Sequence, residues 1–167
     1  MGPAYGRSCA RHRLAVMARV LITGMSGAGK TTVLKELSRR GYRTIDTDYD
    51  DWVLPDGTWD EPRMSALLAS DLCLVVSGTA ENQGRFYDRF IAVVLLSAPV
   101  EVLIDRVSAR TDNPYGNSEA DQSAIRQHVL EVEPLLRNGA TLELDGCRPI
   151  PELADAVENL ITGPGHI

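Results

Sequence analysis

The sequence is poor in cysteine and histidine and contains no long apolar run. Its three cysteines form no C-x-x-C pair and its three histidines are scattered, so no zinc site is predicted. No apolar run approaches the roughly 20 residues that a membrane helix needs. Unpatterned cysteines are typical of a reduced protein, so a cytoplasmic location without a membrane partner is expected.

Positive charge is also scarce. Lysine and arginine number 17 against 23 acidic residues, which gives a net charge of −6, and Lys30 and Lys35 are the only lysines. This balance argues against nucleic acid as the main partner. Phosphate would therefore be held by a local cluster of groups rather than by the field of the whole protein. The 167 residues, 44% of them hydrophobic, suit one domain with a substantial core.

One stretch stands out, because Gly24 to Thr31 reads G-x-x-x-x-G-K-T. The apolar run 20–22 before it suits a buried parallel strand, and Val33, Leu34 and Leu37 after it have helical spacing. Strand, glycine loop and helix thus follow one another in the order that a phosphate-binding loop (P-loop) requires. The alternative, a glycine-rich turn with an incidental lysine, is disfavoured by this context.

This loop has the chemistry to bind nucleotide phosphates. Its glycines let backbone N–H groups face an anion, and the N-terminus of the next helix adds unpaired N–H groups. Lys30 is expected to reach the β- and γ-phosphates of ATP, and the Thr31 hydroxyl to bind Mg²⁺. The predicted cofactor-binding residues here are Gly24, Met25, Ser26, Gly27, Ala28, Gly29, Lys30, Thr31 and Thr32.

Two aspartates follow the next predicted strand. Thr44 and Ile45 suit a short strand, and Asp46 and Asp48 project to one side if the segment is extended. Ligands of parallel α/β sheets bind at the carboxyl ends of strands, so both carboxylates are expected near Mg²⁺ and a phosphate acceptor. The alternative is a solvated acidic turn, and the neighbouring P-loop favours the functional interpretation.

The following segment contains candidates for binding the acceptor. Asp60 is expected to cap a helix that has Pro62 in its first turn. Arg63 near the start of this helix either holds an anionic group of the acceptor or is an ordinary surface arginine. Trp52 and Trp59 either line the acceptor pocket or pack a small subdomain, and the sequence leaves both interpretations open.

A central strand is predicted at 72–76, followed by another buried strand at 91–96. The first ends in Ser77-Gly-Thr79, so Gly78 and Thr79 are expected to face the same crevice. An ordinary turn at the end of a strand explains these residues equally well.

A helical lid is predicted over about 110–137. The helix that begins after Pro99 carries Arg106 and Arg110 four residues apart, so both point the same way. A lid excludes water from the transferring phosphoryl group and its arginines neutralise charge there. Two arginines on a solvated face are the alternative.

The lid is expected to continue as one helix. Ser118 and Asp121 resemble a capping box, and apolar residues between 125 and 136 recur at helical spacing. His128 lies in this stripe and is expected to pack rather than to bind a ligand.

The remaining segments complete a domain at 18–163. A fifth strand is expected at 141–145, and a final amphipathic helix begins at Pro151 and ends before Gly163. Residues 1–17 have no apolar period and are expected to form a disordered extension.

This order of elements resembles the small P-loop kinases, the group of shikimate kinase, gluconate kinase and adenylate kinase, over about residues 19–162. The resemblance implies a three-layer α/β P-loop NTPase fold with a helical lid and a five-stranded parallel sheet of order 2-3-1-4-5. It also implies that Asp46 supports Mg²⁺, that Asp48 contacts the acceptor hydroxyl, and that Arg63 is a loose match to an arginine that binds the acceptor carboxylate. Two further matches are the lid-side arginines, Arg106 and Arg110, and the adenine-contacting loop, Arg148-Pro149.

The chain departs from shikimate kinases on the acceptor side. They have three consecutive glycines where this chain has Ser77-Gly78-Thr79, and the segment before Arg63 is short and holds two tryptophans. The resemblance thus implies ATP use but does not identify shikimate as the acceptor.

The predicted function is ATP-dependent transfer of a phosphoryl group to a hydroxyl or phosphate of a small molecule. Lys30, Asp48, Arg106 and Arg110 are the candidate catalytic residues, and Trp52, Arg63, Gly78 and Thr79 join Asp48 as candidates for substrate binding. The alternative is a nucleotide-binding switch or regulatory ATPase, although an N-K-x-D segment for guanine is absent. The acceptor and the oligomeric state stay open.

Overall fold

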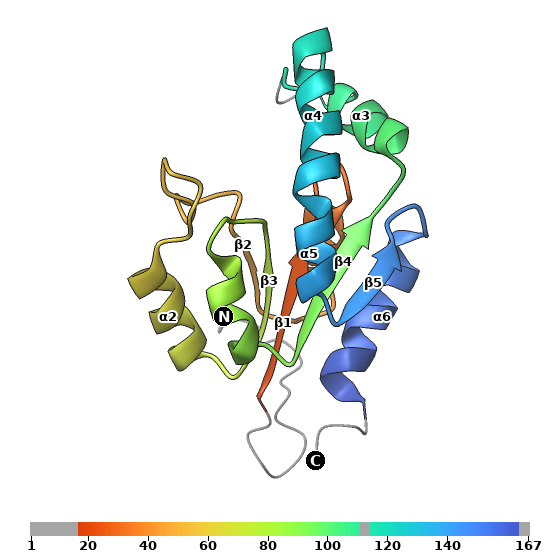
Figure 1. Ribbon diagram of the computed structural model, residues 1–167. Helices are drawn as coiled ribbons and strands as arrows, with labels where there is room; N and C mark the ends of the chain where they lie inside the picture. The colour runs from red at the N-terminus through yellow and green to blue at the C-terminus, as the bar shows by residue number, and fades with distance from the viewer. Residues whose placement is uncertain (1–16, 111–113, 164–167) are drawn as a thin grey trace, which may run out of the picture.

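The computed structural model describes residues 17–110 and 114–163. Apart from Met17, the predicted disordered extension lies outside the described residues. Five parallel strands form one sheet in the order β2-β3-β1-β4-β5, which confirms the predicted topology (Figure 1). The strands are β1 (Ala18–Thr23), β2 (Thr44–Asp46), β3 (Cys73–Ser77), β4 (Ala92–Ser97) and β5 (Leu142–Asp145).

Helices cover both faces of the sheet, as the three-layer prediction requires (Figure 1). Alternate residues of a strand point to opposite faces, and β1 shows the consequence. Val20 and Ile22 join the core formed with α1 (Lys30–Arg39) and α6 (Ile150–Thr162). Leu21 joins a second core, which contains residues of α2 (Glu61–Ser70) and the 3₁₀ helix η2 (Gln83–Arg89).

The register of the strands brings their carboxyl ends to one edge of the sheet. Ser77 at the end of β3 pairs with both Asp46 of β2 and Ile22 of β1. The loops that follow these three strands therefore begin side by side at this edge of the sheet. This alignment places the P-loop next to the segment that begins at Asp46.

Two predicted helix starts are confirmed by their hydrogen bonds. The Asp60 carboxylate accepts a bond from the Arg63 backbone N–H at 3.1 Å, and α2 has a proline in its first turn. The Ser118 hydroxyl accepts a bond from the Asp121 N–H at 3.0 Å and begins α4 (Glu119–Glu131). No helix within the described part of the chain is long and apolar enough to cross a membrane.

The second half of the predicted lid differs from the expectation. Two helices replace one, because α4 ends at Glu131 and α5 (Glu133–Gly139) begins with a proline in its first turn. Proline lacks the N–H that a continuous helix needs, so the stripe is interrupted. The prediction that His128 packs is wrong, because this side chain is exposed.

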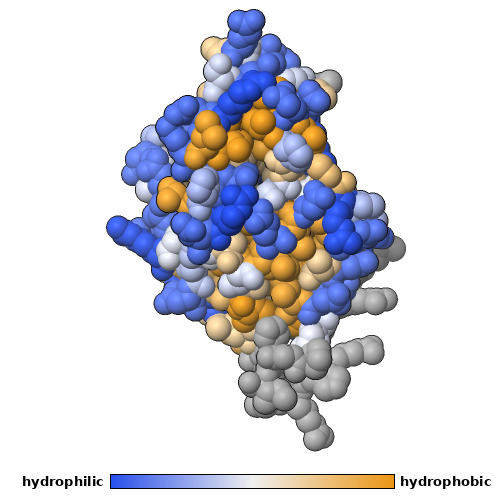
Figure 2. Space-filling view, turned by 45° about the vertical axis from the view of Figure 1, so that its right-hand side comes forward, coloured by the Kyte–Doolittle hydropathy of each residue, from blue (hydrophilic) through white to orange (hydrophobic). Residues whose placement is uncertain are grey.

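Large apolar side chains on both helices are in contact with water. Leu130 and Leu135, both assigned to or near the predicted stripe, are 73% and 67% exposed. On the face seen in Figure 2, apolar residues gather over the upper and central parts, with polar residues around them. The α3 helix (Val100–Ser108) lies beside α4 at the top of Figure 1.

Candidate nucleotide and acceptor site

The shape of the P-loop depends on close backbone approach. A Cβ atom on Gly24 would lie 2.4 Å from the Leu96 carbonyl oxygen, and one on Gly27 would lie 2.7 Å from that of Leu103. Both glycines also have positive φ, at 151° and 85°, which side chains disfavour. Any other residue at either position would push the loop away from β4 or α3.

Lys30 begins α1 and turns back over the loop. Its ammonium donates to the carbonyl oxygens of Gly24 at 2.7 Å and Met25 at 3.1 Å, and the residue is buried. Burial lowers the pKa of Lys30, whereas the carboxylates of Asp48 and Asp46 act in the opposite direction. A buried ammonium close to the loop is thus available to an anion bound there.

Thr31 and Asp46 form a hydrogen-bonded pair of oxygen-bearing side chains beside the loop. The Thr31 hydroxyl donates to Asp46 Oδ2 at 2.8 Å, which joins α1 to the end of β2. The described residues contain no group of three or more His, Cys, Asp or Glu side chains that suits a metal ion. Mg²⁺ in kinases is held by one or two protein oxygens together with phosphates and water, so this pair fits Mg²⁺.

Asp48 lies in a turn, although the sequence analysis assumed an extended segment. Its backbone N–H donates to Asp46 Oδ1 at 3.1 Å, which folds the chain just after β2. The residue as a whole is exposed, but its carboxyl is partly buried, and this burial raises the pKa of Asp48. The positive charge of Lys30 lowers this pKa. Asp46 raises it by a smaller amount, and Arg110 lowers it by a smaller amount. The turn thus brings the carboxylate within electrostatic range of Lys30.

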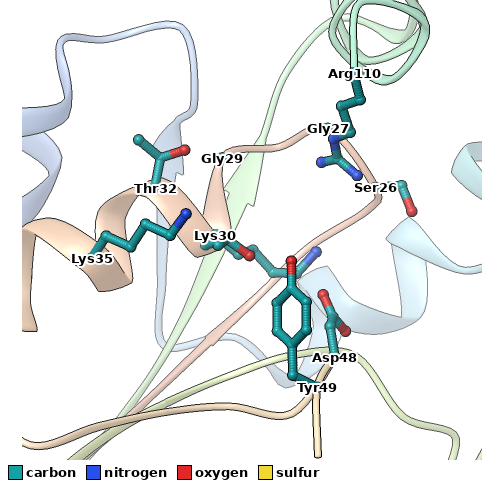
Figure 3. A pocket seen from close by; sticks show the side chains of 10 residues that line it. Ser26, Gly27, Gly29, Lys30, Thr32, Lys35, Asp48, Tyr49 and Arg110 are labelled. Carbon is teal, nitrogen blue, oxygen red and sulfur yellow. The ribbon is translucent and has the colours of Figure 1, made fainter. Parts of the chain in front are cut away.

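These groups surround one cavity of about 610 Å³, which we call the Lys30 cavity. Figure 3 shows side chains that enter it from α1, from the turn after β2 and from the end of α3. Its lining residues are Ser26, Gly27, Gly29, Lys30, Thr31, Thr32, Lys35, Asp48, Tyr49 and Arg110.

Sequence reasoning missed two of these residues, Lys35 and Tyr49. The signals were present, because Lys35 lies four residues after Thr31 on the same helix face and Tyr49 directly follows Asp48. Their positions on exposed surfaces made them look like ordinary polar residues.

A second cavity of about 410 Å³ adjoins the first and is called the Arg106 cavity. It is lined by Gly27, Gly29, Thr32, Arg106, Arg110, Gly146, Arg148, Pro149 and Ile150. The Arg106 guanidinium donates to the carbonyl oxygens of Gly27 at 3.1 Å and Gly146 at 2.9 Å. It therefore ties the P-loop to the loop after β5, while Arg110, just past the end of α3, lines both cavities.

Both tryptophans are buried in the core below α2. Trp59 is fully buried and its indole N–H donates to the Thr47 hydroxyl at 3.1 Å. Its backbone N–H also donates to the buried Asn82 side chain at 2.8 Å. Trp52 is 7% exposed and packs in the same core. Of the two interpretations left open by the sequence, the structure shows packing, although in the second core of the domain rather than in a separate subdomain.

Arg63 lies above Trp52 rather than in the Lys30 cavity. Its guanidinium carbon is 3.8 Å from the centroid of the Trp52 ring, in cation–π geometry. Its Nη1 donates to the Asp50 carbonyl oxygen at 2.7 Å. Asp50 and Asp51 both have positive φ, at 60° and 55°, so Arg63 helps to hold a sharp turn after Asp48.

Gly78 and Thr79 face the start of the P-loop and the turn after β2. The Thr79 hydroxyl donates to the Gly24 carbonyl oxygen at 2.8 Å. A Cβ atom on Gly78 would lie 1.8 Å from Thr47 Oγ1. Neither residue lines the two cavities described so far, and the same holds for Trp52 and Arg63.

Residues 20–127 match a family model described as an AAA domain. Among curated proteins, a nucleotide-binding protein of Rhodospirillum rubrum is 44% identical over 149 residues, which cover 81% of this chain and 40% of that protein. A nucleotide-binding protein of Synechococcus is 28% identical over 126 residues, covering 70% and 37%. The chain thus spans less than half the length of these relatives.

Solved structures share the fold at low sequence identity. A shikimate kinase from Acinetobacter baumannii, in complex with shikimate, superposes with a TM-score of 0.68 at 23% identity, covering 89% of this chain and 95% of that one. A gluconokinase from Sinorhizobium meliloti has a TM-score of 0.56 at 19% identity, covering 87% and 91%. At these identities the likeness establishes the fold alone.

Proposed function

The chain belongs to the AAA domain family and has the fold of the small P-loop kinases, and from this premise we propose that it is an ATP-dependent small-molecule kinase. It moves the γ-phosphoryl group to a hydroxyl or phosphate of its acceptor. One observation carries the proposal, namely that Lys30 and Asp48 share a cavity with the Thr31–Asp46 pair beside them. A carboxylate at this position is suited to accept the proton of an acceptor hydroxyl, as the catalytic aspartate of protein kinases does.

The nucleotide occupies two adjoining cavities in this proposal. Backbone N–H groups from Gly27 to Thr31 bind the phosphates in the Lys30 cavity, since they lead into the N-terminus of α1, the positive end of its dipole. The base lies in the Arg106 cavity, between Arg106 and the 148–149 loop. Arg110 lines both cavities and is placed to neutralise phosphate charge.

Thr31 and Asp46 would hold Mg²⁺, which would supply positive charge against the phosphates. Lys30 adds a preorganised positive charge, because its ammonium is already buried beside the loop.

Asp48 orients the acceptor hydroxyl and takes its proton. A general base works best when its pKa lies near the operating pH, and burial moves the pKa of Asp48 upward, in that direction. Lys30 and Arg110 on the other side of the cavity keep the carboxylate charged in competition with burial.

A nucleotide-dependent switch is the second candidate. The curated relatives are named only as nucleotide-binding proteins, and this chain spans less than half of each. If the chain is such a switch, its ATP turnover is slow and does not depend on an added small molecule.

The test is ADP release from Mg·ATP with and without shikimate, gluconate, nucleosides and nucleoside monophosphates. We expect stimulation by at least one compound in the wild type and none in Lys30→Met. An equal rate in every well, including the blank, contradicts a kinase for these acceptor classes and supports the switch.

A further inference from the structure

Three cavities follow one another along the carboxyl edge of the sheet. The Lys30 cavity shares Gly27, Gly29, Thr32 and Arg110 with the Arg106 cavity on one side. On the other side it shares Thr31, Lys35 and Tyr49 with a third cavity of about 300 Å³, the edge cavity. The proposed nucleotide fills the first two, so the edge cavity is left for another group.

The edge cavity lies between α1 and the outermost strand, β2. Besides the shared residues it is lined by Leu34, Ser38, Thr44 and Asp46. Its surface therefore combines hydroxyl groups, an apolar floor and the carboxylate of the proposed Mg²⁺ pair. Such a mixture suits a polar small molecule with a carbon skeleton.

Lys35 and Tyr49 stand where the edge cavity opens into the Lys30 cavity. Both residues are exposed, Tyr49 by 57%. Among the described residues, the Lys35 ammonium makes no hydrogen bond or ion pair, and the Tyr49 hydroxyl makes no hydrogen bond. Figure 3 shows Lys35 extending from α1 and Tyr49 from the turn after β2, on the side of the cavity away from Arg110.

The opposite side of Asp48, toward α2, is already filled. Trp52 and Trp59 are buried in the core there, and Thr47 occupies the space in front of Gly78. Arg63 is committed to the Trp52 ring and to the Asp50 carbonyl. In the described structure, room is thus left toward β2, in the edge cavity, which adjoins the Lys30 cavity that Asp48 lines.

We propose that the acceptor binds in the edge cavity and is an anion, with its carboxylate or phosphate on Lys35 and its carbon skeleton against Tyr49. This placement lets its reacting hydroxyl lie next to Asp48, the residue before Tyr49. Lys35 is one of only two lysines, and both line the Lys30 cavity. The inference rests on the proposed function, since it gives that reaction an acceptor class.

The binding test uses inorganic phosphate as the probe and needs no turnover. Protein saturated with Mg²⁺ and a non-hydrolysable ATP analogue is titrated with phosphate by calorimetry, so that the P-loop is already filled. Wild type is compared with Lys35→Met and with Arg39→Met. Arg39 is the matched control, because it is an exposed cation on the same helix and lines none of the three cavities.

We expect phosphate to bind the loaded wild type and Arg39→Met equally, and Lys35→Met at least tenfold more weakly. The inference is overturned if Lys35→Met binds phosphate as tightly as the wild type, or if the loaded wild type binds no phosphate. A tenfold loss of analogue affinity in Lys35→Met also overturns it, because Lys35 then contacts the nucleotide.

A second experiment separates the sources of the anion. ADP release is measured with the matched pairs glucose and gluconate, and a nucleoside and its monophosphate. The anionic member of a pair is expected to stimulate turnover, with a KM raised at least tenfold in Lys35→Met and the KM for ATP unchanged. Equal stimulation by a neutral member contradicts the assignment. Lys35-dependent phosphate binding without stimulated turnover removes the proposed function but leaves the anion site standing.

Discussion

The two sides of the Lys30 cavity are built by different means. The nucleotide side consists largely of backbone, since Gly24 and Gly27 are fixed by close contacts with the carbonyls of β4 and α3. The proposed acceptor side consists of side chains, with Asp48 and Tyr49 on a turn and Lys35 on a helix surface. One side is rigid because of its packing, and the other is exposed and depends on individual residues.

Under the proposed function, this difference predicts that nucleotide binding and acceptor choice can change independently. A backbone cradle tolerates few substitutions, whereas an exposed side chain can be exchanged without disturbing the fold. Solved structures of a shikimate kinase and a gluconokinase share this fold at 23% and 19% identity, and one fold can carry different sites. Substitutions on each side should therefore have separable effects.

The largest effect is expected from Lys30→Met on the nucleotide side. Removing a preorganised charge of this kind lowers turnover by about 10³-fold. Methionine has similar length and relieves the cost of a buried ammonium, so the melting temperature should move by no more than about 4 °C. Acceptor-stimulated ADP release and thermal unfolding check both statements. Retained turnover contradicts the assignment of Lys30.

Asp48→Asn tests the acceptor side with a smaller effect. We expect acceptor-dependent turnover to fall by about 10²-fold, the lower range for loss of a general base. Affinity for an ATP analogue should stay nearly unchanged, because Asp48 does not belong to the P-loop. Turnover at the wild-type rate removes the assigned role of Asp48.

Gly78→Ala probes the junction between the two sides. Its Cβ would lie 1.8 Å from Thr47 Oγ1, at a backbone φ of 151°, so the Thr47 bond to Trp59 must shift. A loss of about 1–3 kcal/mol in the free energy of unfolding is expected. The matched control is Gly84→Ala in η2, whose Cβ would meet no atom within 4 Å. Urea unfolding should leave the control near wild type, and equal losses in both variants contradict this account.

The smallest expected effect concerns the pH profile of kcat/KM for ATP, which should be narrower than unperturbed Asp and Lys side chains would give. Asp48 must be a carboxylate, and burial raises its pKa. The acidic limb of the profile, where activity rises with pH, should therefore lie above the usual aspartate pKa of about 3.9. Lys30 must be charged, and burial lowers its pKa. The alkaline limb, where activity falls as pH rises, should therefore lie at a pH below the usual lysine pKa of about 10.4. In Lys30→Arg the alkaline limb should move upward, because arginine stays charged. An alkaline limb that does not move contradicts the role of Lys30 charge.

Most of the fold could be predicted because its signals are local. Buried strands appear in the sequence as short apolar runs, and the G-x-x-x-x-G-K-T stretch predicts the P-loop. Asp60 and Ser118 are capping residues that indicate where α2 and α4 begin. The break between α4 and α5 was missed, since the apolar spacing continues across Pro134 although its ring cannot continue the helix.

The acceptor side was harder because its contacts join distant residues. Packing of Trp59 against Thr47 and Asn82 depends on how α2 folds back on the sheet, which no local pattern encodes. Lys35 and Tyr49 carry no motif, and their spacing from Thr31 and Asp48 is a weak signal beside the cavities that they share.

The most direct test of the central claim follows the γ-phosphoryl group itself. The protein is incubated with γ-labelled Mg·ATP and a mixture of anionic small molecules, and the label is separated into inorganic phosphate and organic phosphate. We expect the label in an organic phosphate with the wild type, and its transfer about 10²-fold slower with Asp48→Asn. Label found only as inorganic phosphate, at the same rate with and without the mixture, would contradict a kinase.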